Sequence, residues 1–291
     1  MVKIDFQIAL FYTVHDSHCD FVLNIHAANT FAQRIDSENL FIDQNVSTRL
    51  IEDTSTGNRW LRFVANAGPL SIQYHAVVTI DHLLIPPEQL WEVPIADLPT
   101  SVMMYLLPSR YCQSDRLQKF AVYEFGHLQK GYSRVLAIQE WVIKRVRFSV
   151  QTTNVSTSAM DTLSDQVGVC RDFAHLMIAL CRALNIPARF VTGIDYGADV
   201  ALGPPDFHAY AEVYLSDRWY IFDPSGLTIP MGLVRLGTGR DAADVAFATM
   251  FGAVQSNMPL ISFKAIEDVG NGYYMPTHTS HALSSDSRIY S

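Results

Sequence analysis

The chain has 291 residues, of which 49% are hydrophobic and 17% are charged, and its formal net charge is −8. These proportions are typical of a packed globular protein with a sizeable core. The negative charge, together with the lack of any Lys/Arg cluster, argues against nucleic acid or an anionic membrane as the main partner.

The cysteines and the N-terminal segment bear on the cellular compartment. Four cysteines without a CxxC pair do not suggest a disulfide framework in a chain of this length. The N-terminal stretch MVKIDFQIALFYTV lacks the long apolar region and the small-residue cleavage site of a signal peptide. No run of about 18 uncharged apolar residues is present. We therefore expect a cytoplasmic protein that has no membrane partner.

The first hundred residues have a β-rich pattern. Residues 4–8 alternate between apolar and polar, and residues 71–85 are rich in β-branched side chains. Turn signals stand at residues 53–58 and 67–69. Several short strands separated by turns predict a β-sandwich. Five prolines between residues 86 and 108 mark a connector, so we divide the chain into domains 1–105 and 106–291.

The second domain is expected to mix helices and strands, with a C-terminal tail. Helical spacing of apolar residues predicts helices over 133–147 and 170–185, separated by a polar loop over 148–165. Strand patterns follow at 188–194, 208–215 and 218–224, and the last two are joined by a two-residue turn. The Gly/Pro/Asp-containing loop over 195–206 is expected to wall the cleft of a site, and a last strand is expected near 260–263.

Three residues of this domain have the types and settings of a thiol catalyst. Cys170 stands where a helix is expected to begin, and there the backbone N–H groups and the helix dipole favour a thiolate. Such a nucleophile needs a base, and the base needs an acceptor on its other nitrogen. The predicted hairpin offers His208 as the base and Asp223 as the acceptor. In a hairpin with a two-residue turn, the numbers of two paired residues add up to an odd value. The numbers 208 and 223 also add up to an odd value, so both side chains lie on one face of the hairpin, directly opposite or diagonal.

The other cysteine and histidine residues of interest are expected to have structural roles. Cys19, Cys112 and Cys181 are expected to be core residues, and a structural use of His175 is favoured over a role as a second base. The residues Cys170, His175, Cys181 and His208 lack the short paired spacings of a metal site. Neither GxxxxGK[ST] nor GxGxxG occurs, so we expect no metal and no cofactor.

Three segments of the second domain resemble the transglutaminase-like superfamily. They are GVCRDFAHLMIALCRALNIPARFVTG (168–193), FHAYAEVYLSDRWYIFDPS (207–225) and GRDAADVA (239–246), the last with Ala242 where an aromatic residue is usual. In the first domain, DTSTGN (53–58) and YLLPSRY (105–111) resemble the N-terminal region of bacterial transglutaminase-like proteins. The resemblance implies an α+β chain, in which a β-sandwich is joined to a papain-like α/β core.

The same resemblance makes Cys170 the nucleophile, His208 the base and Asp223 the residue that orients the base. It implies acyl transfer on amide bonds of a peptide or protein through a thioester. We favour hydrolysis, as in a bacterial cysteine protease, and keep two alternatives: transglutaminase crosslinking, in which an amine takes the acyl group, and a non-catalytic binding module. The Cys170 N–H is one expected oxyanion donor, and Trp141 and Gln166 are alternatives for the second. The sequence does not give the oligomeric state.

Overall fold

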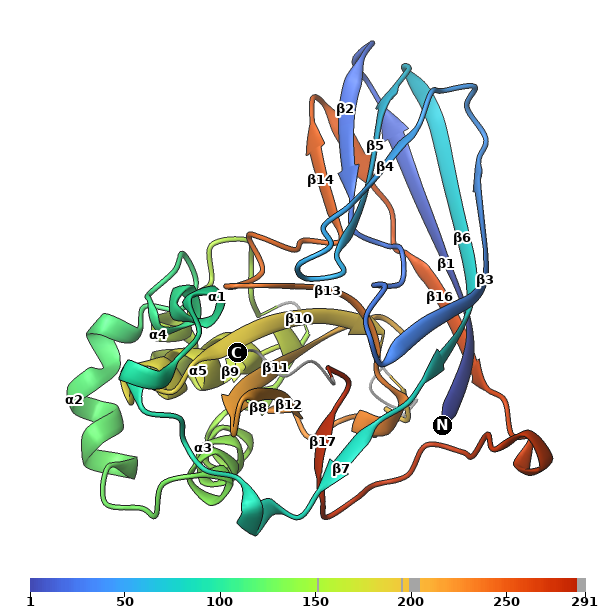
Figure 1. The fold of residues 1–291 in the computed structure, drawn as a ribbon. Coiled ribbons are helices and arrows are strands. Elements are labelled where there is room, and N and C mark those ends of the chain that lie inside the picture. Colours follow the sequence, from blue (N-terminus) through green and yellow to red (C-terminus); the bar gives the residue numbers. More distant parts are fainter. Residues whose placement is uncertain (151, 195, 199–204, 287–291) are drawn as a thin grey trace.

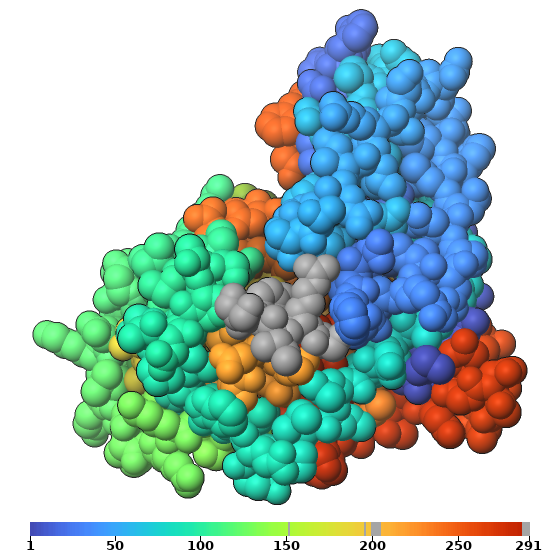
Figure 2. All heavy atoms as spheres, in the orientation of Figure 1, coloured from blue at the N-terminus to red at the C-terminus, as the bar shows by residue number. Residues whose placement is uncertain are grey.

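The computed structural model describes residues 1–150, 152–194, 196–198 and 205–286. The chain is of the predicted α+β class, with β-sheets built on the N-terminal strands and a part that mixes helices and strands (Figure 1). In the space-filling view, residues 1–80 stand at one end of the molecule and the helical residues 114–145 lie at the other (Figure 2). Within the described ranges, no helix is long and apolar enough to cross a membrane.

Two antiparallel sheets form the N-terminal sandwich. The first sheet contains β1 (Val2–Val14), β3 (Gln33–Ile42), β6 (Gly68–Ile80), β15 (Val254–Ser256) and β16 (Leu260–Ala265). The second contains β2 (Cys19–Leu23), β4 (Arg49–Glu52), β5 (Arg59–Ala65) and β14 (Ala248–Phe251). Every even-numbered residue of β1 is buried, because alternate side chains of a strand point to one face. The rings of Tyr12 and Phe21 meet edge to face at 5.3 Å, so the two sheets share one core.

The C-terminal part of the chain returns to these sheets. Strands β15 and β16 pair with β1, and β14 pairs with β2 (Figure 1). The expected strand near 260–263 is therefore present. Residues 248–265 complete the N-terminal sheets, however, which corrects the division that places them in the second domain. The physical reason is that β6 covers only one edge of β1, and the backbone groups on the other edge need partners. The boundary at residue 105 itself stays a prediction.

The second part of the chain is built on a third sheet, in the order β12-β11-β10-β13, with all pairs antiparallel. Its strands are β10 (Ala188–Ile194), β11 (Phe207–Leu215), β12 (Arg218–Phe222) and β13 (Val234–Gly239). Its helices are α1 (Thr100–Met103), α2 (Ser114–Phe125), α3 (Tyr132–Arg145), α4 (Ala159–Asp165) and α5 (Cys170–Ala183). The predicted helices and strands from residue 133 to 224 thus occur close to their expected bounds.

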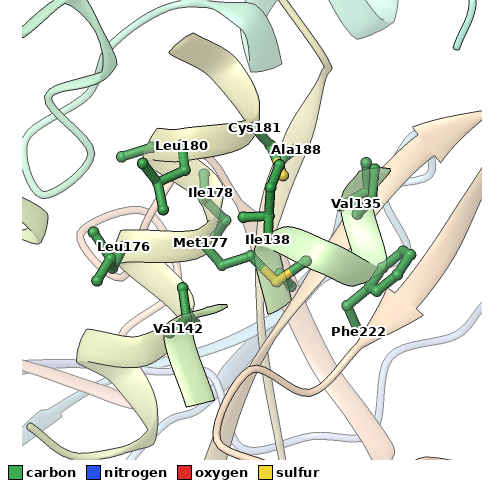
Figure 3. Close-up of a cluster of buried hydrophobic side chains, with 14 of the residues drawn as sticks. Val135, Ile138, Val142, Leu176, Met177, Ile178, Leu180, Cys181, Ala188 and Phe222 are labelled. Atoms are coloured by element: carbon green, nitrogen blue, oxygen red, sulfur yellow. The ribbon is translucent and has the colours of Figure 1, made fainter. Parts of the chain in front are cut away.

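Helix α5 is the centre of this part. It contacts α2, α3 and α4 as well as strands β10 and β11. Figure 3 shows Ile138 and Val142 of α3 near Met177 and Leu176 of α5, in a core cluster that also contains Val135 and Phe222. Every residue from 172 to 183 is buried, so the sequence interpretation of one apolar stripe was too narrow. The core therefore encloses α5 from Asp172 onward, and Cys170 precedes this enclosed part of the helix.

Part of the predicted loop over 148–165 is helical. Helix α4 begins after Ser158, whose backbone N–H and hydroxyl group both donate to the Asp161 carboxylate, at 2.9 and 2.7 Å. This is an N-cap arrangement with an acidic residue at the third helical position. The helix has only seven residues, which is why its apolar spacing is not visible in the sequence.

The shorter elements lie at the margins of the fold. Two strand pairs join distant segments: β7 (Leu83–Ile85) with β17 (Ala282–Ser284), and β8 (Arg147–Phe148) with β9 (Val167–Gly168). Single 3-10 turns occupy Pro87–Gln89, Ile95–Asp97, Met104–Leu106, Pro230–Gly232 and Val269–Asn271. The C-terminal tail is fixed at its described end, because Asp286 is buried and forms an ion pair with Arg189 at 3.0 Å.

Two side-chain amides join the N-terminal sandwich to the third sheet. The Gln33 amide donates to the Arg235 carbonyl and accepts from the Arg235 N–H, at 2.8 and 2.9 Å. The Asn58 amide does the same with the carbonyl and N–H of Thr238, at 2.7 and 2.8 Å. Arg235 and Thr238 belong to β13, the edge strand of the third sheet. The two amides therefore satisfy backbone groups that another strand would otherwise pair.

Candidate active site

The approach to Cys170 is fixed by its neighbours in the sequence. Strand β9 ends at Gly168, where an added Cβ would lie 2.8 Å from the Cβ of Asp172, so only glycine fits beside this side chain. The buried Asp172 carboxylate accepts the Val169 N–H at 2.9 Å, as an acidic residue at the third helical position does. Cys170 is consequently the first residue of α5, as the sequence predicts.

The sulfur of Cys170 lies beside the start of β11. It is 4.0 Å from the carbonyl oxygen of Phe207, the residue that precedes His208. The side chain of Cys170 is half-buried, whereas Cys19, Cys112 and Cys181 are fully buried, and all four cysteines are free thiols. The last three are core residues, as expected. Burial raises the pKa of the Cys112 thiol to about 12 and also raises that of Cys181.

The hairpin places His208 beside Asp223. Glu212 pairs with Ile221 and Ala211 with Phe222, so paired numbers have the odd sum that the sequence argument required. The two turn residues, Ser216 and Asp217, have φ of 45° and 63°, as a tight two-residue hairpin requires. Atoms Nε2 of His208 and Oδ1 of Asp223 are 3.2 Å apart, and both side chains are buried. Of the two arrangements that the sequence allows, directly opposite or diagonal, the diagonal one is present.

The electrostatics of the three groups are coupled. Burial lowers the pKa of His208, but the charge and hydrogen bond of Asp223 and the contact with Cys170 together raise it well above 6.5. Burial raises the pKa of Asp223, while the charge of His208 and hydrogen bonds from His208, Ser225 and Thr228 hold it well below its ordinary range. Because Nε2 faces Asp223, Nδ1 is the ring nitrogen left for Cys170. The arrangement therefore suits an imidazolium held between the Cys170 sulfur and the Asp223 carboxylate.

His175 has a different environment from His208. Its ring is fully buried, stacked on Tyr111 at 4.9 Å, and its Nε2 accepts the Ala242 N–H at 3.2 Å. Burial, followed by the charges of Arg171 and Arg182, lowers its pKa well below 6.5. A neutral imidazole that joins α5 to the GRDAADVA and YLLPSRY segments is structural, in line with the interpretation we favoured.

The candidates for the second oxyanion donor lie in two different settings. Trp141 sits in an aromatic cluster, 5.5 Å from Phe120 and 5.9 Å from Phe125 between ring centres. Gln166 is exposed and caps the C-terminus of α4 with φ of 57°. Both stay predictions. Residues 195 and 199–204, most of the loop that we expected to wall the cleft, lie outside the described residues.

Two residues at the site were missed by the sequence analysis. Ser225 and Thr228 donate to the Asp223 carboxylate, and both are buried. The signal was present in D-P-S-G-L-T, in which a serine follows the aspartate by two positions and a threonine by five.

Metal binding is a separate question. No group of three or more His, Cys, Asp or Glu residues in the described part of the chain could hold an ion.

Comparison with known families covers most of the chain. Residues 119–224 match the transglutaminase-like superfamily, and this range contains all three candidate residues. Residues 2–101 match the N-terminal domain of bacterial transglutaminase.

Individual relatives are similar to this chain over all or part of its length. A crystal structure of a "putative cysteine protease" from Cytophaga hutchinsonii is 39% identical, with a TM-score of 0.90 over 97% of each chain. An uncharacterized protein of Mycobacterium leprae is 32% identical over 117 residues, which are 38% of this chain and 42% of that one. One from Mycobacterium bovis is 33% identical over 105 residues, 32% of this chain and 33% of that one. The matched segments thus span less than half of either mycobacterial protein.

Proposed function

Because the chain belongs to the transglutaminase-like superfamily and carries a bacterial transglutaminase N-terminal domain, we propose that it is a cysteine-dependent acyl-transfer enzyme. Cys170 is its nucleophile, His208 its acid and base, and Asp223 the residue that orients His208. One observation carries the proposal: the buried His208 imidazole lies between the Asp223 carboxylate and the Cys170 thiol at the start of α5. Its substrate is a peptide or protein amide.

The geometry supports a two-step reaction. In the first step the Cys170 thiolate attacks the amide carbonyl carbon, and the C–N bond breaks as His208 passes its proton to the leaving amine. The product is a thioester between Cys170 and the acyl group. In the second step His208 takes a proton from water, the resulting hydroxide attacks the thioester carbonyl, and the C–S bond breaks to release the acid and restore the Cys170 thiolate beside the His208 imidazolium. Asp223 stays ionised throughout and holds the imidazole in position.

The first N–H groups of a helix have no acceptor four residues back, so they are available to developing negative charge. Cys170 is the first residue of α5, and its own N–H is therefore the first oxyanion donor of this proposal. The second donor remains Trp141 or Gln166.

Hydrolysis is favoured over amine transfer. The supporting observation is the Cytophaga hutchinsonii relative, which matches over 97% of each chain and carries the name of a cysteine protease. Crosslinking shares the first step and differs only in the acceptor. A binding module without activity would need none of the coupled charges at His208 and Asp223.

The first experiment tests the nucleophile. The protein is treated with iodoacetamide near pH 6.5 and the labelled sites are mapped, with Cys170→Ala as the control. Cys170 should label well ahead of Cys112 and Cys181, whose burial raises their thiol pKa. Labelling of Cys170 at or below the rate of the buried thiols would refute the enzyme and favour the binding module.

The second experiment tests the acceptor. A peptide library is offered to the protein, and separately a fluorescent amine is offered together with a glutamine-containing protein. Peptide cleavage that is lost in Cys170→Ala supports hydrolysis. Amine incorporation that depends on Cys170, without cleavage, would show that the protein is a transglutaminase.

A further inference from the structure

The Asp223 carboxylate is surrounded by donors from its own turn. Oδ1 accepts the Ser225 N–H at 3.1 Å and the Ser225 hydroxyl at 2.6 Å, besides Nε2 of His208. Oδ2 accepts the Thr228 N–H at 3.1 Å and the Thr228 hydroxyl at 2.7 Å. Four of these five hydrogen bonds therefore come from two residues within five positions of Asp223. Both carboxylate oxygens are used, which fixes the plane of the group.

The turn itself holds the donors in place. Gly226 has φ of +67°, a conformation that favours glycine, and its N–H donates to the Asp223 carbonyl at 3.1 Å. The Ser225 hydroxyl oxygen accepts the Leu227 N–H at 3.3 Å, so its own proton is left for Asp223. Ser225 is 7% exposed and Thr228 is 3% exposed. Water is thus largely excluded from the carboxylate, and the two hydroxyls take over its solvation.

We propose that Ser225 and Thr228 are positioning residues of the reaction, whose hydroxyl groups keep Asp223 ionised and aimed at Nε2 of His208. The inference rests on the proposed function and deepens it. A carboxylate held as an anion by charge-assisted hydrogen bonds cannot take the proton of His208. The imidazolium therefore stays charged beside Cys170, and the turn over residues 223–228 contributes to the acid edge of the active pH range.

Other charged groups also face the pair of His208 and Asp223. Cys170 contacts His208 from α5, and Asp206 interacts with it electrostatically from the residues before β11. Further along the same face of β11 are Tyr210 and Glu212, and Glu212 is neutralised by Arg189 and Arg235. None of these groups is changed by substitutions at Ser225 or Thr228, so a shift in the acid edge reports the hydroxyls.

The test measures labelling of Cys170 by iodoacetamide as a function of pH between 3.5 and 9. Ser225→Ala and Thr228→Val remove one hydroxyl each with little change in shape, and the double variant removes both. Ser225→Thr and Thr228→Ser keep the hydroxyl and serve as matched controls. Each lost hydroxyl should loosen the hold of Asp223 on Nε2 of His208 and move the acid edge up by at most about one pH unit, because a hydrogen bond to a charged group changes an ionisation constant about tenfold. The controls should keep the wild-type profile.

The results of this test distinguish a failure of this inference from a failure of the proposed function. An acid edge of the double variant within about 0.3 pH units of wild type, with Asp223→Asn strongly impaired, would show that the backbone alone holds Asp223 and would overturn the inference. Equal shifts in the variants and their controls would also overturn it. Slow labelling of Cys170 in the wild-type protein would instead overturn the proposed function. If Thr228→Val does not fold, the acid edges of Ser225→Ala and Ser225→Thr are compared instead, and an equal edge in these two variants overturns the inference. With a cleaved peptide in hand, kcat should fall in the hydroxyl-free variants at unchanged KM.

Discussion

Asn58 offers a sharp test of the link between the sandwich and the third sheet. Its amide satisfies both the N–H and the carbonyl of Thr238, and the two residues are each 2% exposed. Replacing Asn58 by alanine leaves these two buried backbone groups without partners. Each such group costs about 1–3 kcal/mol, so Asn58→Ala should lower the free energy of unfolding by about 2–6 kcal/mol.

Urea unfolding followed by tryptophan fluorescence and circular dichroism measures this loss. Asn39→Ala, at an exposed position of β3, is the matched control and should change stability by no more than about 0.5 kcal/mol. If the sandwich separates before the third sheet unfolds, Asn58→Ala should also split one transition into two. A free energy of unfolding for Asn58→Ala within about 0.5 kcal/mol of wild type would refute the reasoning.

Three further predictions concern the core. Glu212→Ala removes the carboxylate shared by the buried Arg189 and Arg235 and should cost about 3–5 kcal/mol in urea unfolding; a loss below about 1 kcal/mol would contradict this. Burial, followed by the charge of Arg59, lowers the pKa of His26 from 6.5 to about 4, against a smaller opposing effect of Glu38. As the pH falls, the unfolded chain therefore takes up this proton before the folded chain does. The free energy of unfolding should consequently fall by about 3 kcal/mol from pH 6.5 to 4. A His26→Phe variant with the same pH slope as wild type would exclude that cause. Leu176→Ala, in the contact of α3 with α5, should cost about 2–5 kcal/mol in thermal unfolding, and a change below about 1 kcal/mol would show that the helices repack around the cavity.

The arrangement of His208 and Asp223 could be predicted because it depends on local rules. A two-residue turn sets the register, and the alternation of side chains along a strand then decides which face each residue occupies. The start of α5 at Cys170 is local in the same sense, since Gly168 and Asp172 lie within four residues of each other.

Features that depend on distant contacts could not be predicted. Strand β16 is visible as an apolar run, but nothing in that run indicates that its partner is β1, some 250 positions earlier. The full burial of α5 likewise depends on three other helices. Ser225 and Thr228 are ordinary turn residues in the sequence, and only the folded turn brings their hydroxyls to one carboxylate. The cytoplasmic location stays a prediction.

The return of residues 248–265 to the sandwich has a consequence for synthesis of the chain. A ribosome completes β1, β2 and the whole third sheet before it makes β14, β15 and β16. During that interval one edge of β1 and one edge of β2 have no partner, and such edges favour association with other chains. A fragment that stops near residue 105 would keep those bare edges permanently. Release of the last strands from the ribosome is therefore the event that closes the N-terminal sheets, although these sheets are the first to be translated.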